Sequence, residues 1–168
     1  MARKRRGNPA LNAPKLSGQG DWYLKRQLQH FKSGARGTHD KDTFGKMMAP
    51  MAATLADDAA INNVVAYIKT LPDNPAAATV NGNAKNGHDP YVTCAACHGR
   101  RWAGHTGNER PRLKGMSDWY LVTQLNNFRQ GIRGAHPKDI YGRADGVDRR
   151  QCWTMTRQPR TSLPTSTR

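Results

Sequence analysis

Cys94-Ala95-Ala96-Cys97-His98 is the stretch of sequence from which the rest of the chain can be interpreted. Two thiols separated by two residues, with a histidine directly after the second thiol, form the covalent attachment pattern of c-type haem. Each thiol adds to one vinyl group of the porphyrin, so the two sulfur atoms must lie about one helical turn apart. The adjacent imidazole can then bind the iron. We therefore expect Cys94 and Cys97 to attach haem c, and His98 to be an axial ligand of the iron.

Two other chemistries use a pair of cysteines at this spacing. Half of a zinc site needs two further nitrogen or sulfur ligands, and the only other cysteine, Cys152, lies far away in a stretch without a pattern. A redox-active dithiol does not require the histidine that follows Cys97. The motif therefore favours haem over both alternatives.

The charge of the chain first suggests a different class of protein. A net charge of +15 over 168 residues is typical of a partner for nucleic acid or an anionic membrane. Most of the excess charge, however, lies in residues 1–6, 100–110 and 143–168, which have neither helical nor strand periodicity. No apolar run reaches membrane-spanning length, and Gly7-Asn8-Pro9 stands where a signal peptide would be apolar. Nucleic-acid binding is thus the weaker interpretation, and no signal peptide is visible.

An internal repeat organises the patterned part of the chain. Pro14–Gly45 aligns without gaps on Pro111–Gly142, and more than half of the aligned positions are identical. The segment Asp21–Leu24, for example, recurs unchanged as Asp118–Leu121. Such self-similarity indicates a tandem duplication.

The first predicted helix occurs in both repeats. Leu24, Leu28 and Phe31 are spaced as one apolar face of a helix, and Gly34 follows where that helix would stop. The same spacing recurs at Leu121, Leu125 and Phe128.

Two further helices are predicted on either side of a linker. A loop is expected through Met47–Met51, and Thr54 with Asp57 resembles a capping box at the start of the next helix. That helix carries a second apolar stripe and is ended by Pro72. Residues 86–98 are expected to form the helix that presents the cysteine motif. The second stripe consists of Ile61, Val64, Val65, Ile68 and Leu71.

These residues together resemble a known family, the two-domain, di-haem class I cytochromes c of bacteria. The resemblance is carried by Cys94–Gly99, Asn12–Leu16, Lys46–Ala52, Val64–Ile68 and the two Trp-Tyr-Leu segments. It implies an all-α fold of two tandem small helical haem domains, with histidine and methionine as iron ligands. It also implies an electron carrier that transforms no substrate and acts in the periplasm.

The resemblance divides the chain into two incomplete domains. Residues 1–72 correspond to the C-terminal part of a first cytochrome c domain, which lacks its own Cys-x-x-Cys-His motif. Residues 73–85 correspond to a linker, and residues 86–168 to a second domain that contains the motif. In the repeat alignment, His98 has its counterpart at Met1, so the first domain's own motif is expected upstream.

The resemblance also suggests the distal ligand of the first domain. Met48 has the position of the methionine that binds the iron opposite the histidine, with Met51 packed behind it; the alternative is that both methionines fill the core. The counterpart of Met48 in the second repeat is Asp145, so the sixth ligand there stays open. Haem c is the expected cofactor, two per chain in the full family pattern and at most one covalently attached here. A single haem shared by Met48 and His98 is the less favoured arrangement.

The repeat is lost between Arg100 and Arg110 and again after Gly142. A shift of the reading frame permits repeat-like residues in both stretches, including a methionine at position 145. We therefore interpret these stretches as frameshifted, which leaves a non-functional gene product as the alternative to a working carrier.

The resemblance implies redox proteins as partners. The donor would be a respiratory or dehydrogenase protein, and the acceptor a terminal oxidase or a similar protein, with a membrane-associated oxidase complex among the candidates. No nucleic-acid partner is expected, because the tryptophans belong mainly to the repeated helices rather than to the basic stretches.

Overall fold

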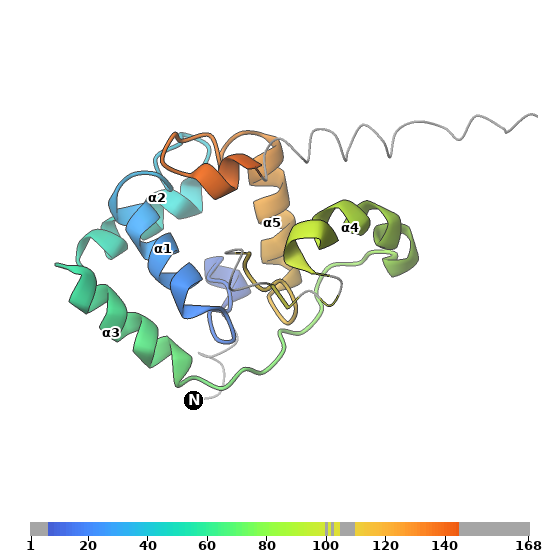
Figure 1. Cartoon of the computed structure of the whole chain (residues 1–168), viewed down its shortest axis with the longest axis horizontal. Helices are drawn as coiled ribbons and strands as arrows, with labels where there is room; N and C mark the ends of the chain where they lie inside the picture. The colour runs from blue at the N-terminus through green and yellow to red at the C-terminus, as the bar shows by residue number, and fades with distance from the viewer. Residues whose placement is uncertain (1–6, 100, 102, 105–109, 145–168) are drawn as a thin grey trace, which may run out of the picture.

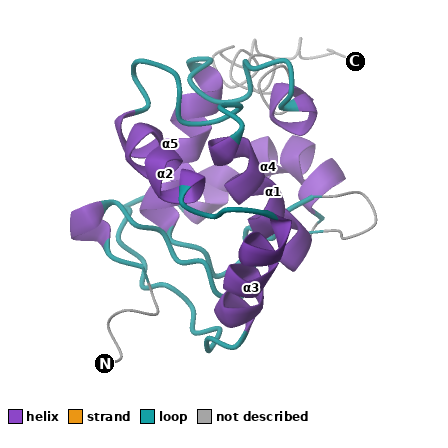
Figure 2. Cartoon of the chain, turned by 90° about the vertical axis from the view of Figure 1, so that its left-hand side faces the viewer, coloured by secondary structure: helices purple, strands orange, loops and turns teal. Residues whose placement is uncertain are grey.

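A computed structural model of the chain describes residues 7–99, 101, 103–104 and 110–144. These residues form helices joined by loops, and no strand occurs among them beyond one isolated bridge (Figure 2). The predicted all-α class is confirmed.

The first repeat contains a small three-helix core. Its helices are α1 (Asp21–Lys32), α2 (Thr43–Ala53) and α3 (Asp58–Lys69), preceded by the short 3₁₀ turn η2 (Pro9–Leu11). Helix α1 packs against both α2 and α3 (Figure 1). Apolar side chains from the two predicted stripes meet between α1 and α3, as expected from their helical spacing. The buried residues of this core are Leu24, Ile61, Val65 and Ile68.

The predicted loop through the methionines is wrong, because Met47–Met51 belongs to α2. The Asp42 carboxylate accepts a hydrogen bond from the Gly45 backbone N–H at 3.0 Å and so caps the helix start. Pro50 lies inside the helix, where a proline removes one backbone hydrogen bond. That loss falls close to the end of the helix at Ala53, so the helix forms despite it.

The predicted capping box is also wrong. Asp57 alone caps α3, with its carboxylate accepting from the Ala60 N–H at 2.8 Å. Thr54 instead ends α2, and its hydroxyl donates to the Met51 carbonyl at 2.7 Å. Helix α3 thus begins directly after Asp57, three residues later than a capping box with Thr54 as the N-cap would require.

The second repeat supplies α4 (Ala84–His98) and α5 (Asp118–Arg129), and residues 140–144 are also helical. Helix α4 begins at Ala84 rather than at residue 86, because the Asn83 side chain accepts hydrogen bonds from the backbone N–H groups of Lys85 and Asn86. In Figure 1, α4 and α5 lie across the molecule from α1, α2 and α3. The predicted helix that ends in the cysteine motif is therefore confirmed.

The segment between α3 and α4 runs without helix along the molecule (Figure 1). Four hydrogen bonds hold it on the second repeat. The Ala76 N–H donates to the Gly115 carbonyl, and the Asp118 carboxylate accepts from the Thr79 N–H, the Thr79 hydroxyl and the Val80 N–H. It overlaps the predicted linker 73–85, although Ala84 already belongs to α4. The division into two domains stays a prediction.

Asp73 joins the two repeats at the start of this segment. Its carboxylate accepts from Lys15 Nζ at 2.5 Å and from Arg112 at 2.5 Å. Lys15 and Arg112 occupy equivalent positions in the two repeats. The Lys15 hydrogen bond and the Arg112 guanidinium together outweigh burial and lower the pKa of Asp73.

Candidate functional site

A cavity of about 590 Å³ lies between the repeats. Side chains from α1, α2, α4 and α5 line it, together with the loop at residues 110–113. The predicted ligands Met48 and His98 both border this cavity, and so does Cys94. The structure therefore brings three of the four predicted haem residues, Met48, Cys94 and His98, to one predominantly apolar space, whereas Cys97 is not among the residues that line it.

His98 ends α4 and is only 7% exposed. Its Nδ1 lies 2.9 Å from the Pro111 carbonyl oxygen. With the proton on Nδ1, the ring donates to this carbonyl, and the Nε2 lone pair is left to bind a metal. A backbone carbonyl behind the ring is the usual way in which a metal-binding histidine is oriented.

The two cysteines lie one turn apart on α4, as the motif requires. Both are partly exposed and neither forms a disulfide. The Tyr91 hydroxyl donates to the Gly99 carbonyl at 2.8 Å and so ties the middle of α4 to the residue that follows it. Burial raises the pKa of the Tyr91 phenol, which keeps it a donor at neutral pH.

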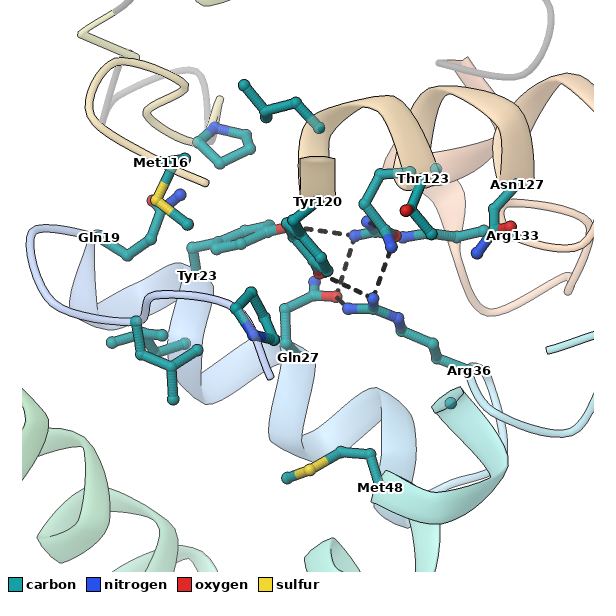
Figure 3. A pocket seen from close by; sticks show the side chains of 18 of the residues that line it. Gln19, Tyr23, Gln27, Arg36, Met48, Met116, Tyr120, Thr123, Asn127 and Arg133 are labelled. Carbon is teal, nitrogen blue, oxygen red and sulfur yellow. Dashed lines mark hydrogen bonds between the residues drawn. The ribbon is translucent and has the colours of Figure 1, made fainter. Parts of the chain in front are cut away.

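Met48 projects from α2 into the region of the cavity (Figure 3). It is 37% exposed, whereas Met47 and Met51 are 63% and 62% exposed. None of the three methionines is buried, so they do not fill the core in the described structure. The assignment of Met48 as the distal ligand, with Met51 behind it, stays a prediction.

Six polar side chains from α1, α5 and the loops that follow them form a cluster, which we call the arginine cluster; Figure 3 labels all of them except Gln124. Arg36 donates to Gln27 at 2.7 Å, to Tyr120 at 2.9 Å and to Gln124 at 3.1 Å. Arg133 mirrors it by donating to Gln124 at 2.6 Å, and to Tyr23 and Gln27 at 3.0 Å. The cluster comprises Tyr23, Gln27, Arg36, Tyr120, Gln124 and Arg133.

Sequence reasoning missed this cluster. Its members form three pairs of identical residues at equivalent positions of the repeats: Tyr23 and Tyr120, Gln27 and Gln124, Arg36 and Arg133. The sequence shows that these residues recur, but it does not show that each arginine donates hydrogen bonds to side chains of the other repeat. A residue retained in both copies and lying off the apolar stripe was the available signal.

The zinc alternative finds no support in the structure. Over residues 7–99 and the described part of 100–144, no group of three or more His, Cys, Asp or Glu side chains could hold a metal ion. Cys152 and Asp145 lie outside the described residues, as do most of the two stretches interpreted as frameshifted.

The residues around the cavity fit a haem. The space is bordered by a buried, oriented imidazole, a cysteine of the attachment motif and a thioether on α2. Large apolar side chains near it are exposed, as expected if an apolar cofactor covers them: Leu11 is 69% and Phe44 46% exposed. Cys94, Cys97, His98 and Met48 are the side chains that would hold the group.

Comparison with known proteins supports the same interpretation of the cavity as a haem site. The profile of the family described as Cytochrome c matches residues 3–72 and 84–158. A thiosulfate dehydrogenase electron acceptor of Stutzerimonas stutzeri is 33% identical over 147 residues, covering 81% of this chain and 64% of the relative. Cytochrome c4 of Azotobacter vinelandii is 31% identical, covering 76% of this chain and 65% of the relative. The chain thus spans slightly less than two thirds of the length of these curated relatives.

Solved structures show the same architecture. The crystal structure of cytochrome c4 from Pseudomonas stutzeri superposes with a TM-score of 0.61 over 85% of this chain and 80% of its own, at 24% identity. A thiosulfate dehydrogenase of Marichromatium purpuratum superposes with a TM-score of 0.64 over 95% of this chain and 36% of its own, at 27% identity. The fold, the site and the matched residues together show that the chain belongs to the cytochrome c family, within its di-haem class I members.

Proposed function

We propose that this chain carries electrons through a haem attached by Cys94 and Cys97, with His98 as an axial ligand. The observation that carries the proposal is the burial of His98 and the 2.9 Å contact of its Nδ1 with the Pro111 carbonyl. An imidazole held in this way presents Nε2 in a defined direction, beside a cavity large enough to take a cofactor.

The protein's own residues have distinct tasks in this proposal. The thiols of Cys94 and Cys97 tether the cofactor, and the Pro111 carbonyl sets the tautomer of His98. Apolar side chains around the cavity exclude water. The Met48 thioether would bind the iron of the first domain, which favours the reduced state. The bound group supplies a one-electron iron couple, which suits an electron carrier that transforms no substrate.

The partners are proposed to be redox proteins. One of the relatives is named as the electron acceptor of thiosulfate dehydrogenase. A dehydrogenase is therefore a candidate donor, and a terminal oxidase or similar protein a candidate acceptor. Docking would occur at the exposed cofactor edge through modest electrostatic complementarity. We propose the periplasm as the location, since c-type haem is attached outside the cytoplasm. Among the described residues, none of the helices has the length and apolar character that a bilayer-spanning segment needs.

A haemochrome spectrum tests the attachment. The full chain is produced together with a haem-attachment system, and its pyridine haemochrome is measured after denaturation and acid extraction. We expect one covalent haem per chain, which is lost in the variant Cys94→Ser/Cys97→Ser. A colourless wild-type protein would contradict the proposal and favour the non-functional alternative.

A second measurement tests the ligands separately from attachment. In the matured protein, His98→Ala should keep the thioether-bound haem but lose the spectral features of imidazole-ligated iron, because the imidazole is gone. His136→Ala is the matched control, since His136 lies in the loop after α5 and does not border the cavity. Equal spectra for both variants would contradict the role of His98.

A further inference from the structure

A titratable imidazole, that of His30, is buried at the contact between the repeats. His30 lies near the end of α1, and its side chain is 14% exposed. Its Nδ1 lies 3.8 Å from Oδ1 of Asp139, a carboxylate of the second repeat that is 7% exposed. This separation is longer than a hydrogen bond, so the carboxylate attracts a proton on His30 only through its charge. A change in the charge of His30 therefore acts directly on the contact between the repeats.

Positive groups outnumber the carboxylate around this imidazole. Three arginines act on it: Arg26 on its own helix, Arg36 in the loop after α1 and Arg133 in the loop after α5. Asp139, just before the helical residues 140–144, is the opposing negative group, and its Oδ1 also accepts a hydrogen bond from a backbone N–H at 3.0 Å. One partly engaged carboxylate thus faces three guanidinium groups. The protonated form of His30 is disfavoured in the folded chain for this reason.

Contacts from both repeats hold the three guanidinium groups in place. Arg36 and Arg133 belong to the arginine cluster, and each also lies 4.6 Å from the ring centre of a phenylalanine of its own repeat. Arg26 of the first repeat lies 4.3 Å from the ring centre of Tyr141 in the second. Turning one of these arginines to solvent, to relieve an added charge on the imidazole, would cost these contacts.

The acid–base behaviour of His30 agrees with this geometry. Burial is the main cause that lowers the pKa of His30, and the charges of the three arginines lower it further against the opposing charge of Asp139. The ordinary pKa of histidine is about 6.5, so the neutral ring is the form present in the folded protein at neutral pH. The contribution of His30 to stability is therefore fully present above that value, and it is lost as the pH falls through the lowered folded value.

The second repeat has no titratable group at the equivalent helical position. The counterpart of His30 is Asn127 on α5, and the counterpart of Asp139 in the first repeat is Asp42. An asparagine side chain takes up no proton, so α5 contributes no imidazole to the contact at this point. Asparagine is also a residue that this position of the repeated helix already accepts, which makes it a suitable replacement for His30.

We propose that His30 is an acid-sensitive switch at the contact between the repeats. As a neutral imidazole it packs beside Asp139, and the repeats stay joined. When it takes up a proton, it adds a positive group to those of the three arginines, and the contact between the repeats loosens while the core between α1 and α3 stays closed. Mild acid thus changes how the two repeats are coupled and leaves the expected iron ligands untouched, because His30 is not one of them.

Hydrogen exchange followed by mass spectrometry tests the switch. The full chain is produced with the haem-attachment system, and exchange is measured at about pH 7.5 and about pH 5, with correction for the intrinsic pH dependence of the amide rate. We expect residues 30–37 and 128–139 to lose protection in acid by about fivefold or more, the factor that corresponds to about 1 kcal/mol of local opening. Helix α3 should keep its protection, because it belongs to the closed core.

Three variants locate the effect. His30→Asn introduces the residue of the second repeat and should keep the protection of both segments in acid. His30→Gln is a second uncharged replacement, with a higher helix propensity than asparagine, and should behave in the same way. His39→Asn is the matched control, because His39 is an exposed histidine of the same repeat, and it should lose protection in acid as the wild type does.

The opposite results overturn the inference. Unchanged protection in the wild-type chain, or an equal acid response in the wild type and both His30 variants, would exclude His30 as the switch. A loss of protection that includes α3 would show general acid unfolding instead. An NMR titration of the reduced wild-type protein is independent of any variant: His30 should titrate below about 6.5, and a midpoint at or above this value would also contradict the proposal.

Discussion

The two repeats begin from nearly the same residues and reach different degrees of burial. In the first repeat, Leu24 of α1 is 5% exposed, because α3 covers it. In the second repeat its counterpart Leu121 is only partly buried, and Leu125 is 47% exposed. No counterpart of α3 occurs among the described residues that follow α5. The difference is confined to the leucines that α3 covers in the first repeat, because Phe31 and Phe128, at 9% and 6% exposure, are buried in both repeats.

The haem-attachment residues lie in the repeat whose core is less closed. The second repeat has the cysteine motif and the oriented imidazole of His98, whereas the first repeat has the closed core and Met48. Each repeat thus has what the other lacks. The arginine cluster and the Asp73 contacts are what join them.

The largest expected effect compares the two leucines directly. Leu24→Ala should destabilise the protein by about 2–5 kcal/mol, since it opens a cavity between α1 and α3. Leu121→Ala should cost less than half as much, because its side chain is only partly buried. Urea unfolding of both variants measures the difference. Equal losses would show that the second repeat has a closed core after all.

The next effect tests the contact between the repeats. Asp73→Asn should cost about 1–3 kcal/mol, because Lys15, at 1% exposure, would keep its charge without an anion. The partial exposure of Asp73 keeps the loss below that of a fully buried pair. Asp40→Asn is the control, since Asp40 and Lys46 pair at the surface, and it should leave the melting temperature unchanged.

The same variant predicts a pH dependence. Lys15 and Arg112 lower the pKa of Asp73 in the folded protein, so its contribution to stability is fully present above the ordinary aspartate pKa. It is lost as the pH falls through the lowered folded value. The stability difference between wild type and Asp73→Asn should therefore be constant near neutrality and shrink in acid. A difference that grows in acid would exclude this role for Asp73.

The smallest effect concerns α3, which has no counterpart in the second repeat among the described residues. Asp57→Ala removes the N-cap of α3 and should destabilise the protein by about 1 kcal/mol. Thr54→Ala, at the end of α2, should have a smaller effect, because the cap of α3 is untouched. Thermal unfolding of the two variants distinguishes the observed cap from the predicted capping box.

Much of the fold could be predicted from local patterns. The spacing of Leu24, Leu28 and Phe31 predicted α1, and the motif that ends in His98 predicted α4, because both signals lie within one helix. Helix α2 was missed altogether, since the cap by Asp42 and the tolerance of Pro50 depend on backbone geometry near the helix ends. Boundary residues are decided by such contacts and not by the apolar pattern.

The candidate site was predicted only in part. Cys94, Cys97 and His98 form one sequence motif with a defined chemistry, so their joint role was apparent. The partner of His98 was not, because the Pro111 carbonyl reaches it only through the course of the intervening loop. The role of Met48 came from resemblance, and its iron contact stays a prediction.

The sequence alone determined helices α1, α3, α4 and α5, the duplication and the attachment motif, because periodicity and spacing act within short stretches of chain. Tertiary structure alone decided that Arg36 and Arg133 cross between the repeats and that Asp73 joins Lys15 to Arg112. These contacts bring together residues far apart in the chain. Their geometry follows from how the two repeats pack against each other, which no local pattern records.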